Sequence, residues 1–243
     1  MLRKIWKRDS MPDELLPEMH PHTLTGIELK ENARKRLATI HNEFRHTFKF
    51  LRNYPHSVSF FGSARFGEDN PHYIKARSLA RRIAKETDYS VVTGGGPGIM
   101  EAANRGAYEA GGKSIGMNII LPHEQKINEY LTAHVRFYYF FIRKVALSFA
   151  ADIYIFFPGG FGTLDEFFEI LTLMQTRKIP QAPLICVGKD FWDHVRQDAI
   201  AMRDTFKTIS PGDENIFHIT DDEDEVMDII KKAPTGKRGV DAK

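Results

Sequence analysis

Two clusters of glycines carry the residues of this chain that are best suited to chemistry. Residues 93–100 read Thr-Gly-Gly-Gly-Pro-Gly-Ile-Met, and residues 157–166 read Phe-Pro-Gly-Gly-Phe-Gly-Thr-Leu-Asp-Glu. Each cluster joins an apolar segment to a helical pattern. Glycine lets a ligand approach the main chain closely, and the free N–H groups at a helix N-terminus favour an anion. The two clusters together predict a nucleotide monophosphate site, with Asp165 and Glu166 in the first turn of the second helix.

The elements that position these residues alternate between strand and helix from residue 57 onward. Strand-helix alternation indicates an α/β fold, a three-layer doubly wound parallel sheet with helices on both faces. Ligand sites in such sheets lie at the carboxyl ends of the strands, where both glycine clusters and Ser63 fall. The expected strands span 57–61, 89–93, 113–120, 131–137, 153–157, 184–187 and 216–219, and the expected helices 73–86, 98–110, 138–150, 163–176, 190–206 and 222–232.

Domain organisation follows from the same pattern. Residues 1–25 are rich in proline and charge without periodicity, which predicts an irregular leader. Apolar positions at helical spacing predict an amphipathic helix over residues 26–52. We expect a single α/β domain over residues 53–232 and a flexible tail over residues 233–243.

Composition excludes several classes of protein. The net charge is only +2, from 34 basic and 32 acidic residues, so no global field favours nucleic acid or an anionic membrane. No apolar stretch reaches transmembrane length or resembles a signal peptide, which makes the cytoplasm the expected location. The single Cys186 cannot form an internal disulfide, and the scattered histidines predict no metal site.

The combined motifs resemble the LOG (Lonely Guy) family, whose members have often been labelled "possible lysine decarboxylase". The resemblance extends over residues 57–230 and rests on the Gly-Gly-Gly-Pro-Gly-Ile-Met run at 94–100, the Arg143-Lys144 pair and the Pro-Gly-Gly-Phe-Gly-Thr-Leu-Asp-Glu run at 158–166. Phe140 and Leu147 stand where plant members have methionines, so cytokinin specificity does not transfer to this chain.

This resemblance implies a Rossmann-like protein that hydrolyses the N-glycosidic bond of a nucleoside 5′-monophosphate, such as AMP or a cytokinin riboside monophosphate, without a cofactor. It also implies a homodimer or a higher oligomer of dimers. We expect the aromatic run at 137–142 to supply core and dimer interface rather than to stack on a base. The family motif assigns catalysis to Arg143 and Glu166. Substrate or phosphate binding is expected of Ser63, Gly95, Gly96, Gly98, Met100, Lys144, Gly159, Gly160, Gly162 and Thr163.

The residue chemistry agrees with that expectation. Cleavage of the bond builds positive charge on the ribose, which a carboxylate stabilises while it orients or deprotonates water. A first-turn position favours the ionised form of Glu166 through the helix dipole, and Arg143 keeps its proton. We therefore expect Glu166 to act as a base or electrostatic stabiliser, and Arg143 to orient the phosphate or ribose and to pair with Glu166.

Three alternatives stay open at this point. The same fold could be a non-catalytic nucleotide-binding module, which would need neither Arg143 nor Glu166. The decarboxylase label would demand pyridoxal phosphate on a Schiff-base lysine, and no such lysine is recognisable. Arg143, Lys144 and Glu166 could also form only a surface ion pair, which contributes about 1 kcal/mol or less.

Overall fold

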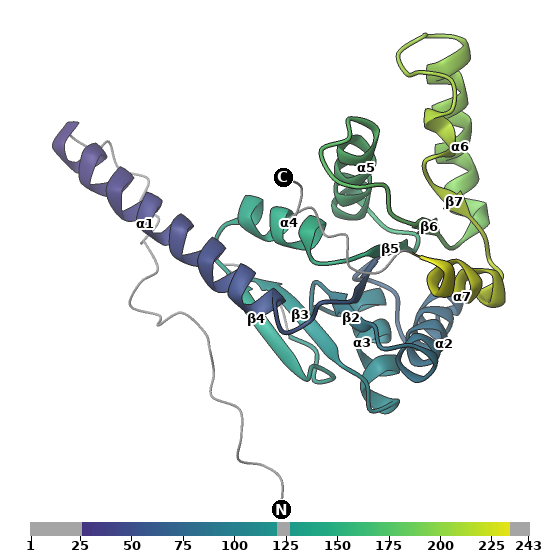
Figure 1. Cartoon of the computed structure of the whole chain (residues 1–243), viewed down its shortest axis with the longest axis horizontal. Helices are drawn as coiled ribbons and strands as arrows, with labels where there is room; N and C mark the ends of the chain where they lie inside the picture. The colour runs from purple at the N-terminus through teal and green to yellow at the C-terminus, as the bar shows by residue number, and fades with distance from the viewer. Residues whose placement is uncertain (1–25, 121–126, 234–243) are drawn as a thin grey trace, which may run out of the picture.

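The structure is a computed structural model that describes residues 26–120 and 127–233, with side chains from residue 31 onward. The predicted leader lies outside the described residues, as does the predicted tail apart from Ala233. In chain order the elements are α1 (Gly26–Leu51), β1 (Ser57–Phe61), α2 (Pro71–Glu86), β2 (Ser90–Thr93), α3 (Ile99–Glu109), β3 (Ser114–Ile119), β4 (Ala133–Phe137), α4 (Phe140–Phe149), β5 (Ile153–Phe156), α5 (Phe161–Gln175), β6 (Leu184–Cys186), α6 (Lys189–Asp204), the short 3-10 helix η2 (Asp213–Asn215), β7 (His218–Ile219) and α7 (Glu223–Lys232) (Figure 1).

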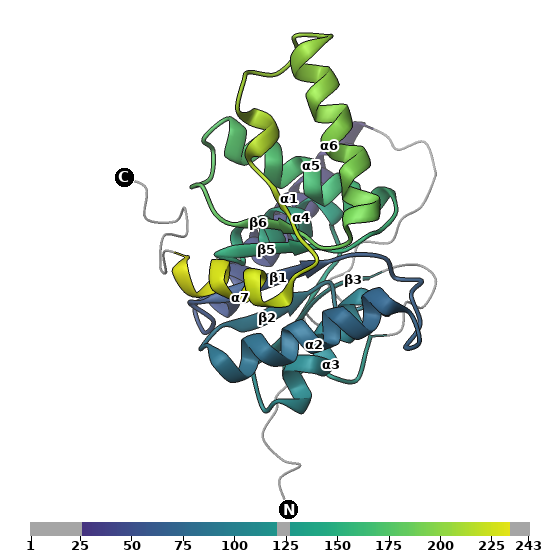
Figure 2. The ribbon, with the colours of Figure 1, turned by 90° about the vertical axis from the view of Figure 1, so that its right-hand side faces the viewer.

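Helices form a layer on each side of the sheet. Figure 2 shows α2 and α3 below the strands and α5 and α6 above them. Helices α2, α3 and α7 pack into one buried apolar cluster, whereas α1, α4, α5 and α6 pack into a second cluster on the opposite face. The three-layer arrangement predicted from the alternation of elements is therefore confirmed.

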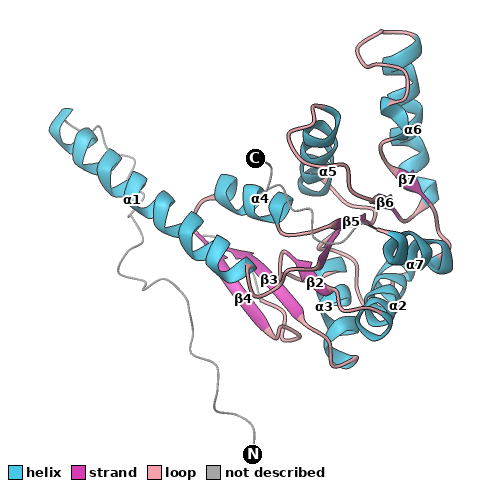
Figure 3. Cartoon of the chain, viewed as in Figure 1, coloured by secondary structure: helices cyan, strands magenta, loops and turns pink. Residues whose placement is uncertain are grey.

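The strands of the described residues form one parallel sheet in the order β4-β3-β2-β1-β5-β6-β7 (Figure 3). β1, β2 and β5 are buried along their whole length, because helices cover both faces at the centre of the sheet. β4, at one edge, alternates buried and exposed residues. The chain order reverses at β1, which lies between β2 and β5, and such a switch point is where a ligand crevice opens in a doubly wound sheet.

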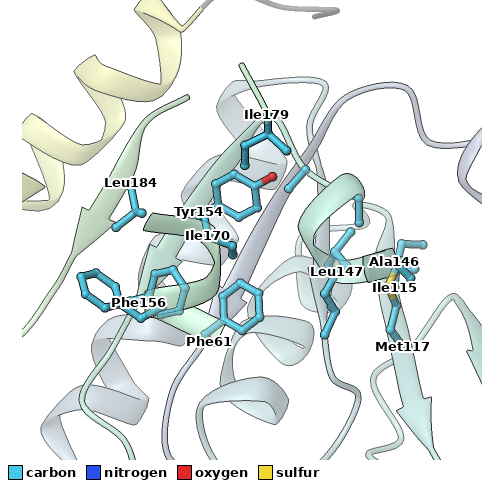
Figure 4. Packing of buried hydrophobic residues seen from close by; sticks show 14 of the residues in the cluster. Phe61, Ile115, Met117, Ala146, Leu147, Tyr154, Phe156, Ile170, Ile179 and Leu184 are labelled. Atoms are coloured by element: carbon cyan, nitrogen blue, oxygen red, sulfur yellow. The ribbon is translucent and has the colours of Figure 1, made fainter. Parts of the chain in front are cut away.

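Aromatic packing holds the site-bearing helices on the sheet. The ring of Phe167 on α5 lies 4.8 Å from the ring of Trp192 and 5.4 Å from that of Phe156. Figure 4 shows Phe61 beside Phe156, and Leu147 of α4 beside Met117 of β3. These contacts fix α5 against β5 and α4 against β3.

Helix α1 extends beyond the sheet along much of its length (Figure 1). Its C-terminal half is in contact with the domain, since Glu43, Thr47 and Leu51 are buried. Leu37, two to three turns earlier, is 65% exposed. The helix predicted for residues 26–52 is thus present, with one half packed.

Most predicted bounds differ from the structure by one or two residues, and local geometry explains two of these differences. β7 has two residues, His218–Ile219, because the chain before it turns through η2. α5 starts at Phe161, two residues earlier than predicted, since its N-cap is Gly160 and the Leu164 N–H already donates to the Gly160 carbonyl at 3.0 Å. The prediction that Asp165 and Glu166 lie in the first turn is therefore wrong. They lie in the second turn.

Gly98 is expected to be a steric requirement of this fold. Its φ is +71°, and an added Cβ would lie 2.2 Å from the Ser63 carbonyl oxygen. Gly111 has a similar φ of +75° with no atom within 4 Å of an added Cβ. We expect Gly111→Ala to cost about 1 kcal/mol from backbone strain alone, and Gly98→Ala to cost more than about 2 kcal/mol. Urea unfolding of both variants measures their free energies of unfolding, and equal losses of stability in the two would contradict a steric requirement for glycine at position 98.

Candidate functional site

A cavity of about 820 Å³ opens at the carboxyl ends of β1 and β5. This volume is in the usual range for small-molecule sites. Its wall includes the loop after β1, the start of α5 and one face of α4. The cavity therefore lies at the switch point of the sheet, and eight of the twelve predicted site residues line it.

Arg143 projects from α4 into this cavity and is held by backbone groups. Its Nε–H donates to the Met117 carbonyl at 2.8 Å. The guanidinium packs against Gly94, where an added Cβ would lie 2.3 Å from Nη2. Gly94 is required here because any larger residue would displace the guanidinium. Burial lowers the pKa of Arg143 while Glu166 opposes that change, and the group still keeps its proton.

Glu166 projects from α5 into the same cavity. Burial of its carboxyl group raises its pKa to about 7, although the positive charge of Arg143 opposes the shift. The prediction that the helix dipole favours the ionised form is therefore wrong. The carboxyl group lies one turn away from the helix end, where the dipole effect has faded, so desolvation dominates. A carboxyl group with this pKa exchanges a proton readily near neutral pH.

The charges of Arg143 and Glu166 influence each other's pKa. Among the described residues, however, no ion pair within 4.0 Å joins the Arg143 guanidinium to the Glu166 carboxylate, and the ion pairs formed there between α4 and α5 are those of Lys144. The expected direct pair is not formed. This arrangement leaves the facing polar atoms of both side chains available to a bound molecule.

Lys144 does not line the cavity, although it neighbours Arg143 in the chain. Its Nζ lies 2.9 Å from Asp165 Oδ2 and 3.1 Å from Glu169 Oε2. Burial lowers the pKa of Lys144, but the bonds to the two carboxylates outweigh it and raise the pKa overall. Lys144 thus joins α4 to α5 beside the Arg143 and Glu166 positions.

The start of α5 presents main-chain groups to the cavity. Gly160, its N-cap, has no side chain to bond the first-turn N–H groups. Gly159, Gly160, Gly162 and Thr163 all line the cavity. Gly159 lets Thr163 pack closely, since an added Cβ would lie 2.2 Å from Thr163 Oγ1. A helix start of this kind suits an anion.

The glycine turn after β2 lies behind the wall. Met100 and Gly94 line the cavity, whereas Gly95, Gly96 and Gly98 do not. Gly95 has φ +70° and its added Cβ would meet Asn118 at 2.4 Å. These glycines shape the turn.

Ser63 joins three segments at the cavity. Its N–H donates to the Pro158 carbonyl, and its own carbonyl accepts from the Ile99 N–H, both at 3.0 Å. Its Oγ accepts from the Arg65 N–H at 3.1 Å. Ser63 thereby ties the loop after β1 to the starts of α3 and α5.

Several lining residues were not predicted as site residues. Arg65 follows β1 directly, so its position at the carboxyl end of a central strand was a usable signal. Four more are aromatic side chains from separate parts of the chain, and only the tertiary structure brings them together. They are Phe66, Phe140, Phe161 and Phe191, of which Phe161 is 93% exposed.

Neither a cluster of metal ligands nor a membrane-spanning helix occurs among the described residues. No group of three His, Cys, Asp or Glu side chains there could hold a metal ion. None of the helices in the described ranges has the length and apolar character needed to cross a membrane.

Fold and cavity define a class: a Rossmann-like α/β protein with an arginine and a buried carboxyl group facing one cavity at the switch point of the sheet. Comparison with known proteins narrows the class. Residues 100–230 match the family model described as "Possible lysine decarboxylase", and the chain belongs to that family.

Curated relatives carry a more specific name, which confirms the resemblance to the LOG family. A probable cytokinin riboside 5′-monophosphate phosphoribohydrolase from Oryza sativa subsp. japonica is 31% identical over 113 residues, which cover 46% of this chain and 46% of the relative. A cytokinin riboside 5′-monophosphate phosphoribohydrolase from Rhodococcoides fascians is 29% identical over 49% of this chain and 61% of its own length. The matches thus span about half the length of each protein.

Solved structures share the fold. A molybdenum cofactor binding protein from Rippkaea orientalis aligns with a TM-score of 0.53 and 24% identity over 72% of this chain and 93% of its own. The molybdenum cofactor carrier protein from Chlamydomonas reinhardtii aligns with a TM-score of 0.55 and 20% identity over 73% of this chain and 97% of its own. At these identities the likeness establishes the fold alone.

The raised pKa of Glu166 predicts a pH-dependent stability. The folded state holds this proton more tightly than the unfolded state, with pKa values of about 7 and 4.5. The linked stability is fully present below pH 4.5 and is lost as pH rises through 7. Glu166→Gln removes this titration, so the stability of the variant relative to wild type should increase over that range, by up to about 3 kcal/mol. Urea unfolding at pH 4.5 and 8 tests this, and a constant difference would contradict it.

Proposed function

We propose that this protein hydrolyses the N-glycosidic bond of a nucleoside 5′-monophosphate. Water adds its oxygen to the ribose C1′ as the C1′–N bond breaks, one proton of that water ends on the leaving nitrogen, and free base and ribose 5-phosphate leave. One observation carries the proposal: Glu166, half-buried and with its pKa raised to about 7, lines one cavity together with Arg143 and with the start of α5, which has no side-chain cap. The names of the curated relatives support the same reaction.

Each part of the cavity has a role in the proposed reaction. The first-turn N–H groups of α5 bind the 5′-phosphate, because a helix N-terminus favours an anion. Glu166 stabilises the developing charge on the ribose and removes a proton from the attacking water. Arg143 orients the ribose or its phosphate. The aromatic lining, with Phe140 and Leu147 near the arginine, receives the base.

The proposal includes a homodimer, with the aromatic run at 137–142 as its interface. Phe140 and Phe141 are 56% and 48% exposed, and Phe168 of the neighbouring α5 is 42% exposed. Exposed aromatic side chains of this kind favour association.

The decarboxylase reading is disfavoured by the state of Lys144. A Schiff-base lysine needs a neutral amine, whereas the carboxylates of Asp165 and Glu169 stabilise the ammonium form. Lys144 also lies outside the cavity wall.

A binding module without catalysis is the second candidate. The fold by itself does not decide between the two, because two proteins of this fold are named for binding or carrying a cofactor. A binding module would need the α5 start but not the Arg143 and Glu166 pair.

Turnover of a panel of nucleoside monophosphates, beginning with AMP, tests the proposal. We expect release of base and ribose 5-phosphate, and a kcat/KM that rises with pH to a plateau above about 7 as Glu166 loses its proton. Arg143→Ala and Glu166→Gln should each lower turnover by at least about 100-fold. Arg81→Ala, on the exposed side of α2, is the control and should leave it unchanged. AMP binding without release of any base would move the protein to the binding-module class.

Phosphate binding at the α5 start has a separate test. At Gly160 an added Cβ meets no atom within 4 Å, yet the residue lines the cavity. Gly160→Ala should therefore leave the fold intact and weaken AMP binding about tenfold or more, because the methyl group blocks approach to the main chain. Gly67→Ala, equally unhindered but outside the cavity wall, is the matched control. Calorimetric titration that gives equal affinities for both variants would refute this binding mode.

A further inference from the structure

Helix α4, which carries Arg143, begins without a cap from its own segment. Its N-cap residue, Tyr139, makes no side-chain cap hydrogen bond. The N–H groups at a helix start need partners when they are buried. For the N–H groups of Tyr139 and of Tyr138 before it, the partner comes from another part of the chain.

Glu43 on α1 supplies that partner across 95 residues of sequence. One carboxylate oxygen accepts from the Tyr138 N–H at 2.6 Å, and the other accepts from the Tyr139 N–H at 3.4 Å. The residue is only 5% exposed. Its charge lies at the positive end of the α4 dipole, where an anion is stabilising. Through these bonds α1 holds Tyr139, the N-cap residue of α4, and Tyr138 before it.

Tyr139, which Glu43 holds, is bonded in turn to the backbone of Arg143. The carbonyl of Tyr139, whose N–H donates to Glu43, accepts from the Arg143 N–H at 3.2 Å. From that point the Arg143 side chain reaches the Met117 carbonyl and packs against Gly94. A displaced Tyr139 would carry Arg143 away from the cavity wall.

A buried carboxylate at this position is costly unless it does something that an apolar residue cannot. Burial raises the pKa of Glu43, and the two N–H bonds oppose that shift. The neighbouring positions Ile40 and Phe44 already supply apolar contacts of α1 with the domain. Packing alone therefore does not account for Glu43.

We propose that Glu43 is a positioning residue, which fixes the first turn of α4 and thereby holds the Arg143 guanidinium opposite Glu166. The expected effect on turnover rests on the proposed function. The expected effect on the position of Arg143 relative to Glu166 does not, because both are groups of the folded protein itself. The proposal gives α1 a role in the site, although α1 lies outside residues 100–230, which the family model matches.

The pKa of Glu166 reports the position of Arg143, whose charge lowers it. We would titrate ¹³C-carboxyl-labelled full-length protein by NMR and assign the signal with Glu166→Gln. In Glu43→Ala the pKa of Glu166 should rise by about one unit as the guanidinium moves away. Glu43→Gln keeps one acceptor oxygen and should raise the pKa of Glu166 by less. This variant also provides the test if Glu43→Ala does not fold.

Phe48→Ala is the matched control. Phe48 lies one turn or more further along α1 and packs edge-on against Phe149 of α4 at 6.3 Å. Its removal should lower the Tm through loss of this ring contact, yet leave Glu43 bonded to Tyr138 and Tyr139 and the pKa of Glu166 unchanged. Equal Glu166 pKa values in wild type, Glu43→Ala and Glu43→Gln would overturn the proposal, as would an equal rise in Phe48→Ala.

Turnover adds a second readout. If the proposed hydrolysis is right, kcat should fall roughly 10–100-fold in Glu43→Ala, recover in part in Glu43→Gln, and stay unchanged in Phe48→Ala. A wild-type protein that hydrolyses no nucleoside monophosphate would refute the proposed function. The Glu166 titration would then still decide whether Glu43 positions Arg143.

Discussion

Burial of the Glu166 carboxyl group opposite Arg143 is the constraint on which the rest of the site depends. Desolvation raises the pKa of the carboxyl to about 7, and the guanidinium limits that rise. An unpaired carboxyl group in a closed interior would simply stay protonated. A paired one on the surface would stay ionised. The pKa of Glu166 lies between these limits because Glu166 and Arg143 line one cavity from different helices without direct contact.

Keeping the two groups at that separation requires both helices to be fixed independently. α5 is packed on β5 and α6 through Phe167 and Trp192. α4 is packed on β3 through Leu147 and Met117. Lys144 then joins the two helices through Asp165 and Glu169, so the residue beside the arginine sets the spacing of the site from outside the cavity.

The N-cap of α5, at the cavity, differs from the N-caps of α2 and α7. α2 begins at Asn70, which accepts from the His72 N–H, and α7 begins at Asp222, which accepts from the Asp224 N–H. α5 begins at a glycine with no side-chain cap, and its start lines the cavity. α3, α4 and α6 also begin without a side-chain cap, so it is the glycine-lined cavity at the start of α5, and not the missing cap alone, that leaves N–H groups for a ligand there.

The sequence by itself determined the element order, the parallel sheet and the placement of the second glycine cluster at the end of a strand, because apolar periodicity and strand-end glycines are local signals. The convergence of Arg143 with Glu166 was expected only from the resemblance to the LOG family. Only the tertiary structure decided the protonation state of Glu166, since burial depends on helices that are distant in sequence. It also decided that Lys144 turns toward Asp165 and Glu169, and that the turn at Gly95 to Gly98 supports the wall from behind. The contact between Glu43 and the start of α4 spans 95 residues, so no local pattern could indicate it.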